Sequence, residues 1–303
     1  MNSTTSQTAV LIIGAGYTGR RLHASLSNNG HDVISARRDA NETGQIAIDL
    51  DEPSSLAALQ QRLAAITELQ VAYLVPPPGD LDDVTGTDQR LQALLDALPV
   101  NAIRRFVLAS TTGVYGDRQG ARVDERSQVQ PASRRARARV AAERTLNAWA
   151  STHQISTVTL RIAGIYGPGR LPLEALKNAA PMVRAEESGP GNRIHVDDLV
   201  KIFERALFSP APPPLVNVSD GDHRNSAAFA ANVADITGLP APVTISLSQA
   251  KREFSPMRLS FILESRTLDN TLLREGLGVT LSYADPLDGI RASLAEAPSQ
   301  PAD

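Results

Sequence analysis

A continuous apolar run near the N-terminus ends directly in glycines. Residues 9–13 read Ala-Val-Leu-Ile-Ile, which is typical of a strand buried on both faces of a parallel sheet. Residues 14–19 match the pattern Gly-x-Gly-x-x-Gly, and a helical pattern over 17–28 is closed by Asn29-Gly30. A strand, a glycine loop and a helix in this order predict a unit in which backbone amides at the helix start can hold a phosphate group.

Apolar runs and helical patterns alternate over most of the chain. This alternation predicts right-handed crossovers and a parallel sheet covered on both faces. The expected fold class is α/β, a Rossmann-type doubly wound parallel sheet with a small C-terminal substrate lobe. Further strands are expected at 32–36, 45–48, 71–75, 106–109, 158–162 and 215–218, and further helices at 54–66, 88–98, 133–150, 195–208, 226–237 and 266–275.

The rhythm of strands and helices breaks after residue 165, where Gly-Pro clusters at 167–169 and 189–191 bracket a connection without a regular pattern. This break predicts two lobes. The expected division is a disordered tail at 1–7, a dinucleotide-binding core at 8–165 to which 195–220 return, a substrate lobe made of 166–194 and 221–290, and a flexible tail at 291–303.

The composition narrows the classes of partner. The 303 residues carry a formal net charge of -3 and no cysteine, and 27 of the 30 basic residues are arginine. A weak negative charge predicts no nucleic-acid or anionic-membrane partner, and the lack of cysteine excludes disulfides and thiolate chemistry. The uncharged N-terminal residues resemble no signal peptide, and no apolar stretch approaches the ~20 residues that span a bilayer, so a cytoplasmic location is expected.

The residues around the second strand predict which cofactor the glycine loop takes. Gly14, Gly16, Tyr17, Thr18 and Gly19 would form the phosphate-binding turn. NAD sites hold the ribose 2′-hydroxyl with an acid about 20 residues on. This chain has Arg37 and Arg38 there, which suit a 2′-phosphate, so NADP is preferred over NAD. Asp49 and Leu50 are expected beside the adenine. The alternative for the loop is a glycine turn that binds no ligand, and the alternative for Arg37 and Arg38 is that both are merely solvated.

Four ordered motifs carry a family resemblance. They occupy residues 14–19, 110–116 (Ser-Thr-Thr-Gly-Val-Tyr-Gly), 160–169 and 193–199 (Arg-Ile-His-Val-Asp-Asp-Leu). Over residues 8 to 290 the chain resembles the NAD(P)-dependent epimerase/dehydratase family, in the extended and atypical branch of the short-chain dehydrogenase/reductases. The resemblance implies a nicotinamide cofactor, a small-molecule substrate and, as in many extended members, a homodimer formed through two helices of each subunit.

The resemblance also implies catalytic positions, which this chain fills unusually. Thr111 occupies the place of the Ser or Thr that hydrogen-bonds the reacting oxygen. The family's Tyr and Lys, spaced Tyr-x-x-x-Lys, correspond to Arg135 and Arg139. Arginine stays protonated near neutral pH and cannot replace a tyrosine as acid and base. Any remaining proton transfer would need another group, and Tyr115, Tyr166 and His195 are the nearby candidates, although each also fits a purely structural role.

Arg135 and Arg139 are four residues apart, so they are expected on one helix face, where they could clamp a carboxylate or phosphate. The alternative is a merely solvated arginine run. Asp197 and Asp198 beside His195 are interpreted as helix-capping acids, so no metal site is predicted. Two functions remain open: an oxidoreductase or epimerase/dehydratase-like enzyme acting on a small, polar, anionic substrate, or an NADP-binding sensor that has lost turnover with the Tyr/Lys pair.

Overall fold

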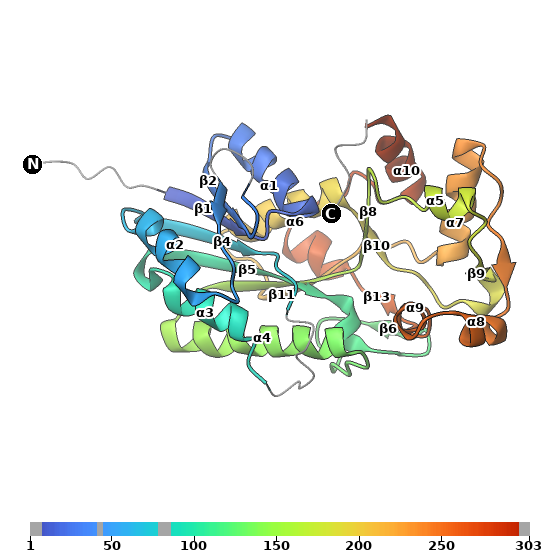
Figure 1. Ribbon diagram of the computed structural model, residues 1–303, viewed down its shortest axis with the longest axis horizontal. Coiled ribbons are helices and arrows are strands. Elements are labelled where there is room, and N and C mark those ends of the chain that lie inside the picture. Colours follow the sequence, from blue (N-terminus) through green and yellow to red (C-terminus); the bar gives the residue numbers. More distant parts are fainter. Residues whose placement is uncertain (1–7, 41–44, 78–85, 297–303) are drawn as a thin grey trace, which may run out of the picture.

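A seven-stranded sheet forms the larger part of the computed structural model, which describes residues 8–40, 45–77 and 86–296 (Figure 1). Every strand pair in this sheet is parallel. In spatial order the strands are β11 (Leu215–Val218), β7 (Thr157–Ile162), β5 (Ile103–Thr111), β4 (Glu68–Tyr73), β1 (Thr8–Ile13), β2 (Asp32–Arg37) and β3 (Gln45–Ala47).

The strand order places a crevice at the end of β1. From β1 the chain continues outward through β2 and β3, and it then returns to the other side of β1 as β4. The connections that leave β1 and β4 therefore depart in opposite directions. In an open parallel sheet, ligands bind outside the carboxyl ends of the strands at such a reversal. The glycine loop at the end of β1 lies at this point.

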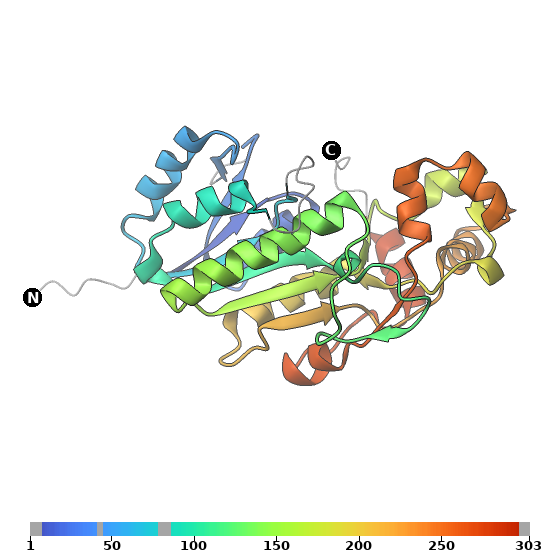
Figure 2. The same cartoon turned by 90° about the horizontal axis from the view of Figure 1, so that it is seen from below.

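Helices cover both faces of the sheet, as Figure 2 shows most clearly for the long helix α4. Adjacent residues of β1 belong to different apolar clusters: Leu11 lies in the cluster that contains Leu59 and Trp149, whereas Ile12 lies in the one that contains Leu22 and Phe203. Because both faces are buried, the strand is apolar at every position. One face carries α1 (Tyr17–Asn28) and α6 (Val196–Phe208), and the other carries α2 (Leu56–Leu63), α3 (Gln89–Ala97) and α4 (Arg134–His153).

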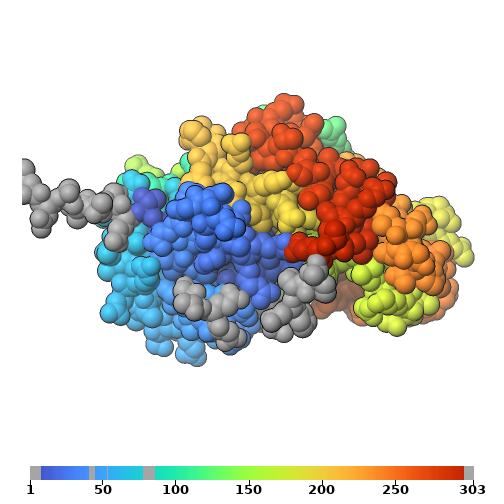
Figure 3. All heavy atoms as spheres, turned by 90° about the horizontal axis from the view of Figure 1, so that it is seen from above, coloured from blue at the N-terminus to red at the C-terminus, as the bar shows by residue number. Residues whose placement is uncertain are grey.

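The second lobe is built from helices and short strand pairs beyond the carboxyl ends of the sheet (Figure 1). Its helices are α5 (Leu173–Lys177), α7 (Ser226–Thr237), α8 (Leu247–Glu253), α9 (Pro256–Ile262) and α10 (Pro286–Ala295). The strand pairs are β8 (Gly164–Tyr166) with β10 (Arg193–His195), β9 (Met182–Val183) with β12 (Thr244–Ile245), and β6 (Arg122–Val123) with β13 (Thr267–Leu268). In Figure 3 the red C-terminal residues abut the blue residues of α1.

The Rossmann-type fold class is confirmed, and each of the seven predicted strands is present in the large sheet. The helix predicted at 266–275 is wrong. Residues 267–268 pair with β6 instead, and only 272–276 form a single π-helical turn. The tail predicted from residue 291 also needs correction, because α10 extends to Ala295 and buries Ile290 and Ser293. The predicted tail at 1–7 and residues 297–303 lie outside the described residues. None of the helices in the described ranges has the length and apolarity that crossing a bilayer requires.

Candidate functional site

The three glycines of the loop after β1 have three different physical roles. Gly14 adopts a φ of +98°, and its N–H donates to the Ala36 carbonyl at 2.9 Å, which closes the turn against β2. A Cβ on Gly19 would stand 2.4 Å from the Gly14 oxygen, so only glycine lets α1 start this close to β1. A Cβ on Gly16 would meet no described heavy atom within 4 Å. The backbone at Gly16 is therefore open to a ligand, as phosphate binding requires.

All nine predicted cofactor residues line a single cleft of about 1590 Å³. Pockets for one drug-sized ligand usually enclose roughly 300–1,000 Å³. The cleft therefore has room for a dinucleotide and a second molecule. The nine residues are Gly14, Gly16, Tyr17, Thr18, Gly19, Arg37, Arg38, Asp49 and Leu50.

The end of the cleft next to β2 and β3 contains charges of both signs. Arg37 and Arg38 have no side-chain hydrogen bond or ion pair within the described part of the chain. Asp51, which also lines this end, is hydrogen-bonded to the Arg90 guanidinium, and this contact holds the pKa of Asp51 below its ordinary value. Because Arg90 already compensates Asp51, the guanidinium groups of Arg37 and Arg38 stay available to a ligand.

Thr111 and Tyr115 are only four residues apart in the sequence, but their side chains lie in different places. Thr111 ends β5, lines the cleft and accepts a hydrogen bond from the Gly113 N–H at 3.2 Å. Tyr115 is fully buried, and its hydroxyl donates to Asn217 Oδ1 at 2.7 Å. Burial raises the pKa of Tyr115. The residue is absent from the described lining of the cleft. The structure therefore keeps Thr111 as a candidate and does not bring Tyr115 to the same site.

Arg135 and Arg139 both line the cleft from the first turns of α4, but different elements hold their guanidinium groups. Arg135 is exposed and lies 4.1 Å from the ring centre of Phe261 in α9. Arg139 donates from Nη1 to the Val75 carbonyl, just after β4, at 3.0 Å, and burial lowers its pKa. The expected shared helix face is present. The two groups do not, however, converge on one point as a clamp would require.

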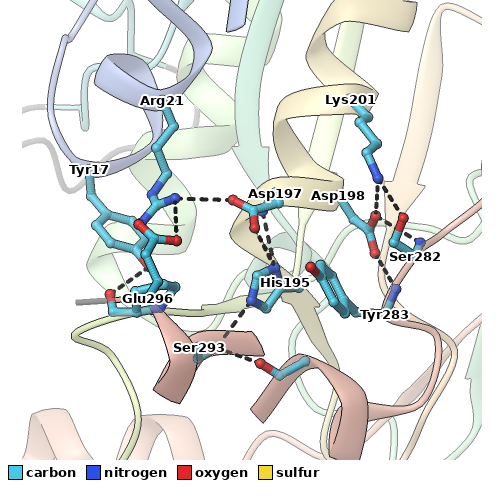
Figure 4. Close-up of polar contacts among 12 residues, drawn as sticks. Tyr17, Arg21, His195, Asp197, Asp198, Lys201, Ser282, Tyr283, Ser293 and Glu296 are labelled. Atoms are coloured by element: carbon cyan, nitrogen blue, oxygen red, sulfur yellow. Dashed lines mark hydrogen bonds and ion pairs between the residues drawn. The ribbon is translucent and has the colours of Figure 1, made fainter. Parts of the chain in front are cut away.

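The other two proton-transfer candidates, Tyr166 and His195, are both buried. Tyr166 lines the cleft, but its hydroxyl is buried without a described hydrogen-bond partner and packs against Gly289 of α10, where a Cβ would come within 2.2 Å of it. Burial raises the pKa of Tyr166. His195 is completely buried: Nδ1 accepts from the Asp197 N–H at 3.2 Å, and Nε2 lies 3.1 Å from Ser293 Oγ (Figure 4). Burial also lowers the pKa of His195, which makes it a poor proton donor near neutral pH.

Asp197 and Asp198 connect elements rather than forming a metal site. Asp197 pairs with Arg21 of α1 at 3.1 Å. Asp198 is buried and accepts from the backbone N–H groups of Ser282 and Tyr283 at 2.9 and 2.8 Å (Figure 4). Within residues 8–40, 45–77 and 86–296, no group of three or more His, Cys, Asp and Glu side chains is arranged to bind a metal ion.

The lobe side of the cleft contains arginines that the sequence did not identify. Arg266 is 8% exposed, donates to the Gly116 carbonyl at 2.7 Å, and has a buried Nε without a described partner. The arginines of this side come from segments that lie far apart in the chain, so no local sequence pattern could have grouped them. Four lining arginines lie in or next to the lobe: Arg170, Arg193, Arg258 and Arg266.

Comparison with known proteins places this arrangement in a family. The model of the NAD dependent epimerase/dehydratase family matches residues 10–219. Protein YeeZ of Escherichia coli K12 is 27% identical over 290 residues, which cover 92% of this chain and 97% of YeeZ. The UDP-glucose 4-epimerase of Mycolicibacterium smegmatis is also 27% identical, over 88% of this chain and 92% of that enzyme.

A solved structure agrees with the sequence comparisons. A conserved protein of unknown function from Silicibacter pomeroyi DSS superimposes with a TM-score of 0.81 at 30% identity, and the match covers 96% of this chain and 100% of that one. The matched family region contains the glycine loop, Thr111 and the motif around His195. The chain therefore belongs to the NAD dependent epimerase/dehydratase family.

Proposed function

We propose that this protein binds NADP, in preference to NAD, over the glycine loop and acts on a small anionic molecule held between the core and the lobe. The observation that carries the proposal is the single cleft lined by all nine predicted cofactor residues and continued by arginines of the lobe. Membership in an NAD-dependent family supports the dinucleotide.

The preference for NADP rests on Arg37 and Arg38. A guanidinium donates two parallel hydrogen bonds to phosphate oxygens, whereas a carboxylate at this position would repel a 2′-phosphate. Arg37 is half-buried at the end of β2, and Arg38 is exposed next to it. Both line the cleft without a described hydrogen bond or ion pair, although the charge of Arg38 helps to lower the pKa of Asp51.

The charge of the substrate side supports an anionic substrate. Glu264 is the only acidic residue that the lobe contributes to the described lining, and it is already paired with Arg266 at 3.1 Å. Arg135 has no described hydrogen-bond or ion-pair partner, and its guanidinium lies only against the Phe261 ring. An excess of cationic groups in a partly enclosed cleft favours a carboxylate or phosphate of the substrate.

A bound nicotinamide would supply the acceptor or donor of a hydride. This chain would contribute the Thr111 hydroxyl to position the reacting oxygen, and it would contribute the positive charge of Arg139 beneath the cleft. The class of reaction is oxidoreduction or an epimerase/dehydratase-type conversion. The similarity to a UDP-glucose 4-epimerase supports an epimerase-type reaction, and the lack of the Tyr/Lys pair sets this chain apart from the family's pattern.

The second candidate is a sensor that binds the cofactor without turnover. It is favoured by Arg135 and Arg139 at the acid–base positions and by the structural hydrogen bonds that hold Tyr115 and His195. A sensor should bind NADP⁺ and NADPH with different affinities and leave NADPH unoxidised in the presence of small carbonyl acids. An oxidoreductase should oxidise it, whereas an epimerase- or dehydratase-type enzyme should exchange a substrate proton without net oxidation of NADPH. The homodimer remains a prediction that sedimentation can test. The cytoplasmic location remains a prediction that cell fractionation can test.

Replacement of Arg37 and Arg38 by alanine tests the cofactor preference. The double variant should bind NADPH at least about tenfold more weakly, because each hydrogen bond to a charged group contributes roughly 1.5–3 kcal/mol. NADH affinity should hardly change. Arg104→Ala, an exposed arginine at the start of β5 that pairs with Glu68, is the matched control. Calorimetric titration gives both affinities. Equal loss for NADPH and NADH would contradict 2′-phosphate recognition.

A further inference from the structure

The loop that follows β8 lies directly over the first turn of α1. The Tyr17 hydroxyl donates to the Pro168 carbonyl at 2.9 Å. A Cβ on Gly167 would come within 2.6 Å of the Tyr17 hydroxyl, so the loop approaches the ring as closely as glycine permits. The loop then turns back, with the Arg170 N–H donating to the Gly167 carbonyl at 3.0 Å. Tyr17, which directly follows the open glycine of the phosphate loop, thus joins the core to the lobe.

Arg170 is positioned by this contact. Its guanidinium carbon lies 4.0 Å from the centre of the Tyr17 ring, a distance typical of a cation–π stack. Stacking uses the face of the guanidinium and leaves the N–H groups at its edge free to donate in the plane. The side chain is exposed and lines the cleft. The ring therefore fixes an arginine whose hydrogen-bond donors are unused.

The charge of Arg170 is not compensated, in contrast to the other cation near the ring. Arg21 lies 5.5 Å from the ring centre of Tyr17 and is held by Asp197 at 3.1 Å and Glu296 at 2.6 Å (Figure 4). Arg170 has no ion pair or side-chain hydrogen bond within the described residues. Of the two cations, Arg170 is the one available to an anion.

We propose that Arg170 binds the diphosphate of the dinucleotide from the lobe side, opposite the backbone amides of the glycine loop, with the Tyr17 ring as its platform. This inference rests on the proposed function, since it requires a dinucleotide over Gly16. The diphosphate is the anion expected next to Tyr17, because the amides of the first turn of α1 point to it. Bidentate donation by arginine would then connect the lobe to the cofactor.

The test compares wild type with Arg170→Gln by calorimetric titration with three ligands. NADPH and NADH both carry the diphosphate, whereas adenosine 2′-phosphate lacks it. Arg170→Gln should weaken NADPH and NADH by roughly tenfold, as loss of a charged hydrogen bond predicts, and leave adenosine 2′-phosphate unchanged. Arg291→Gln, an exposed arginine of α10 that pairs with Asp288, is the control and should alter none of the affinities.

Each outcome separates this inference from the proposed function. Wild type that binds neither dinucleotide would overturn the proposed function itself. Wild type that binds, with an Arg170→Gln variant of equal affinity, would overturn the role of Arg170 alone, and so would an equal loss for adenosine 2′-phosphate. Arg170→Lys keeps the charge without the planar fork, and thermal unfolding checks that each variant folds. An Arg170→Lys affinity for NADPH between those of wild type and Arg170→Gln supports bidentate binding. An Arg170→Lys affinity as weak as that of Arg170→Gln supports it more strongly.

Discussion

Asp220 follows β11 and is a buried acid 5% exposed to solvent. Its Oδ1 accepts from the Asp222 N–H at 3.0 Å, and its Oδ2 has no described partner. Burial raises the pKa of Asp220 to about 7, with the charge of Asp222 adding to the shift and those of Arg193 and Arg224 opposing it. The carboxyl therefore takes up a proton on folding at mildly acidic pH.

The sign of the resulting pH dependence follows from the raised pKa. Between the unfolded value near 4 and the folded value near 7, the folded chain binds the extra proton, so stability falls as pH rises through this window. Asp220→Asn removes that loss and should stabilise the protein by about 2–4 kcal/mol at pH 8 and by less at pH 5. Denaturant unfolding at both pH values measures this difference, with Asp288→Asn as the exposed control. A gain that is the same at both pH values would contradict the assignment.

Single residues were the least predictable part of the site. The glycine loop and Thr111 could be placed from sequence because their roles depend on local backbone geometry. Tyr115 could not, since its direction depends on Asn217, which is 102 residues away. The same holds for Arg135, whose ring partner Phe261 comes from the other lobe.

Helix α4 is fixed to the sheet by a buried polar link. Glu143 accepts from Arg161 of β7 at 3.1 and 2.8 Å, and it also contacts the hydroxyl of Ser110 of β5. Glu143 and Arg161 are 7% and 6% exposed. Arg135 and Arg139 lie on the same helix and line the cleft. The link between Glu143 and Arg161 therefore also fixes the backbone positions of these two arginines.

Removal of one member of the link should destabilise the fold strongly. Glu143→Ala leaves the Arg161 guanidinium buried without its carboxylate, which typically costs about 3–5 kcal/mol. Chemical denaturation measures the change in the free energy of unfolding. Glu204→Ala, an acid of the outer face of α6 with only a long contact to Asn29, is the control and should change stability by less than about 0.5 kcal/mol. A loss for Glu143→Ala no greater than that of the control would contradict the role of this pair.

Helices and strands whose limits are set by nearby residues were predicted more accurately than those whose limits depend on distant partners. The helix predicted at 17–28 was confirmed at both ends because its limits lie in local signals, the glycine loop and Asn29-Gly30. β4 begins at Glu68 rather than residue 71, since residues 68–70 pair with β1 although Glu68 and Gln70 have polar side chains. Residues 266–275 showed a helical pattern, but pairing of Thr267 and Leu268 with β6 prevailed over it.

The molecule as a whole brings two unlike surfaces to one cleft. The core contributes a glycine loop set by the parallel sheet, and the lobe contributes arginines and phenylalanines from separated segments. The α/β alternation predicts the core, because strand order and crossover hand follow general rules. The lobe has no comparable rule: its short strands pair across long sequence separations, as β9 with β12 and β6 with β13. The half of the cleft that the core lines was therefore predictable, and the half that the lobe lines was not.

Titration of the purified protein with NADPH, in parallel with its Gly16→Asp variant, tests most directly whether this cleft holds a dinucleotide. A Cβ at residue 16 would meet no described heavy atom within 4 Å, so the variant should unfold at the same temperature as wild type while its carboxylate repels the diphosphate. One NADPH should bind per wild-type chain, and the affinity of Gly16→Asp for NADPH should be at least about a hundredfold weaker. Wild type that binds no NADPH, or a variant that binds it equally well, would contradict it.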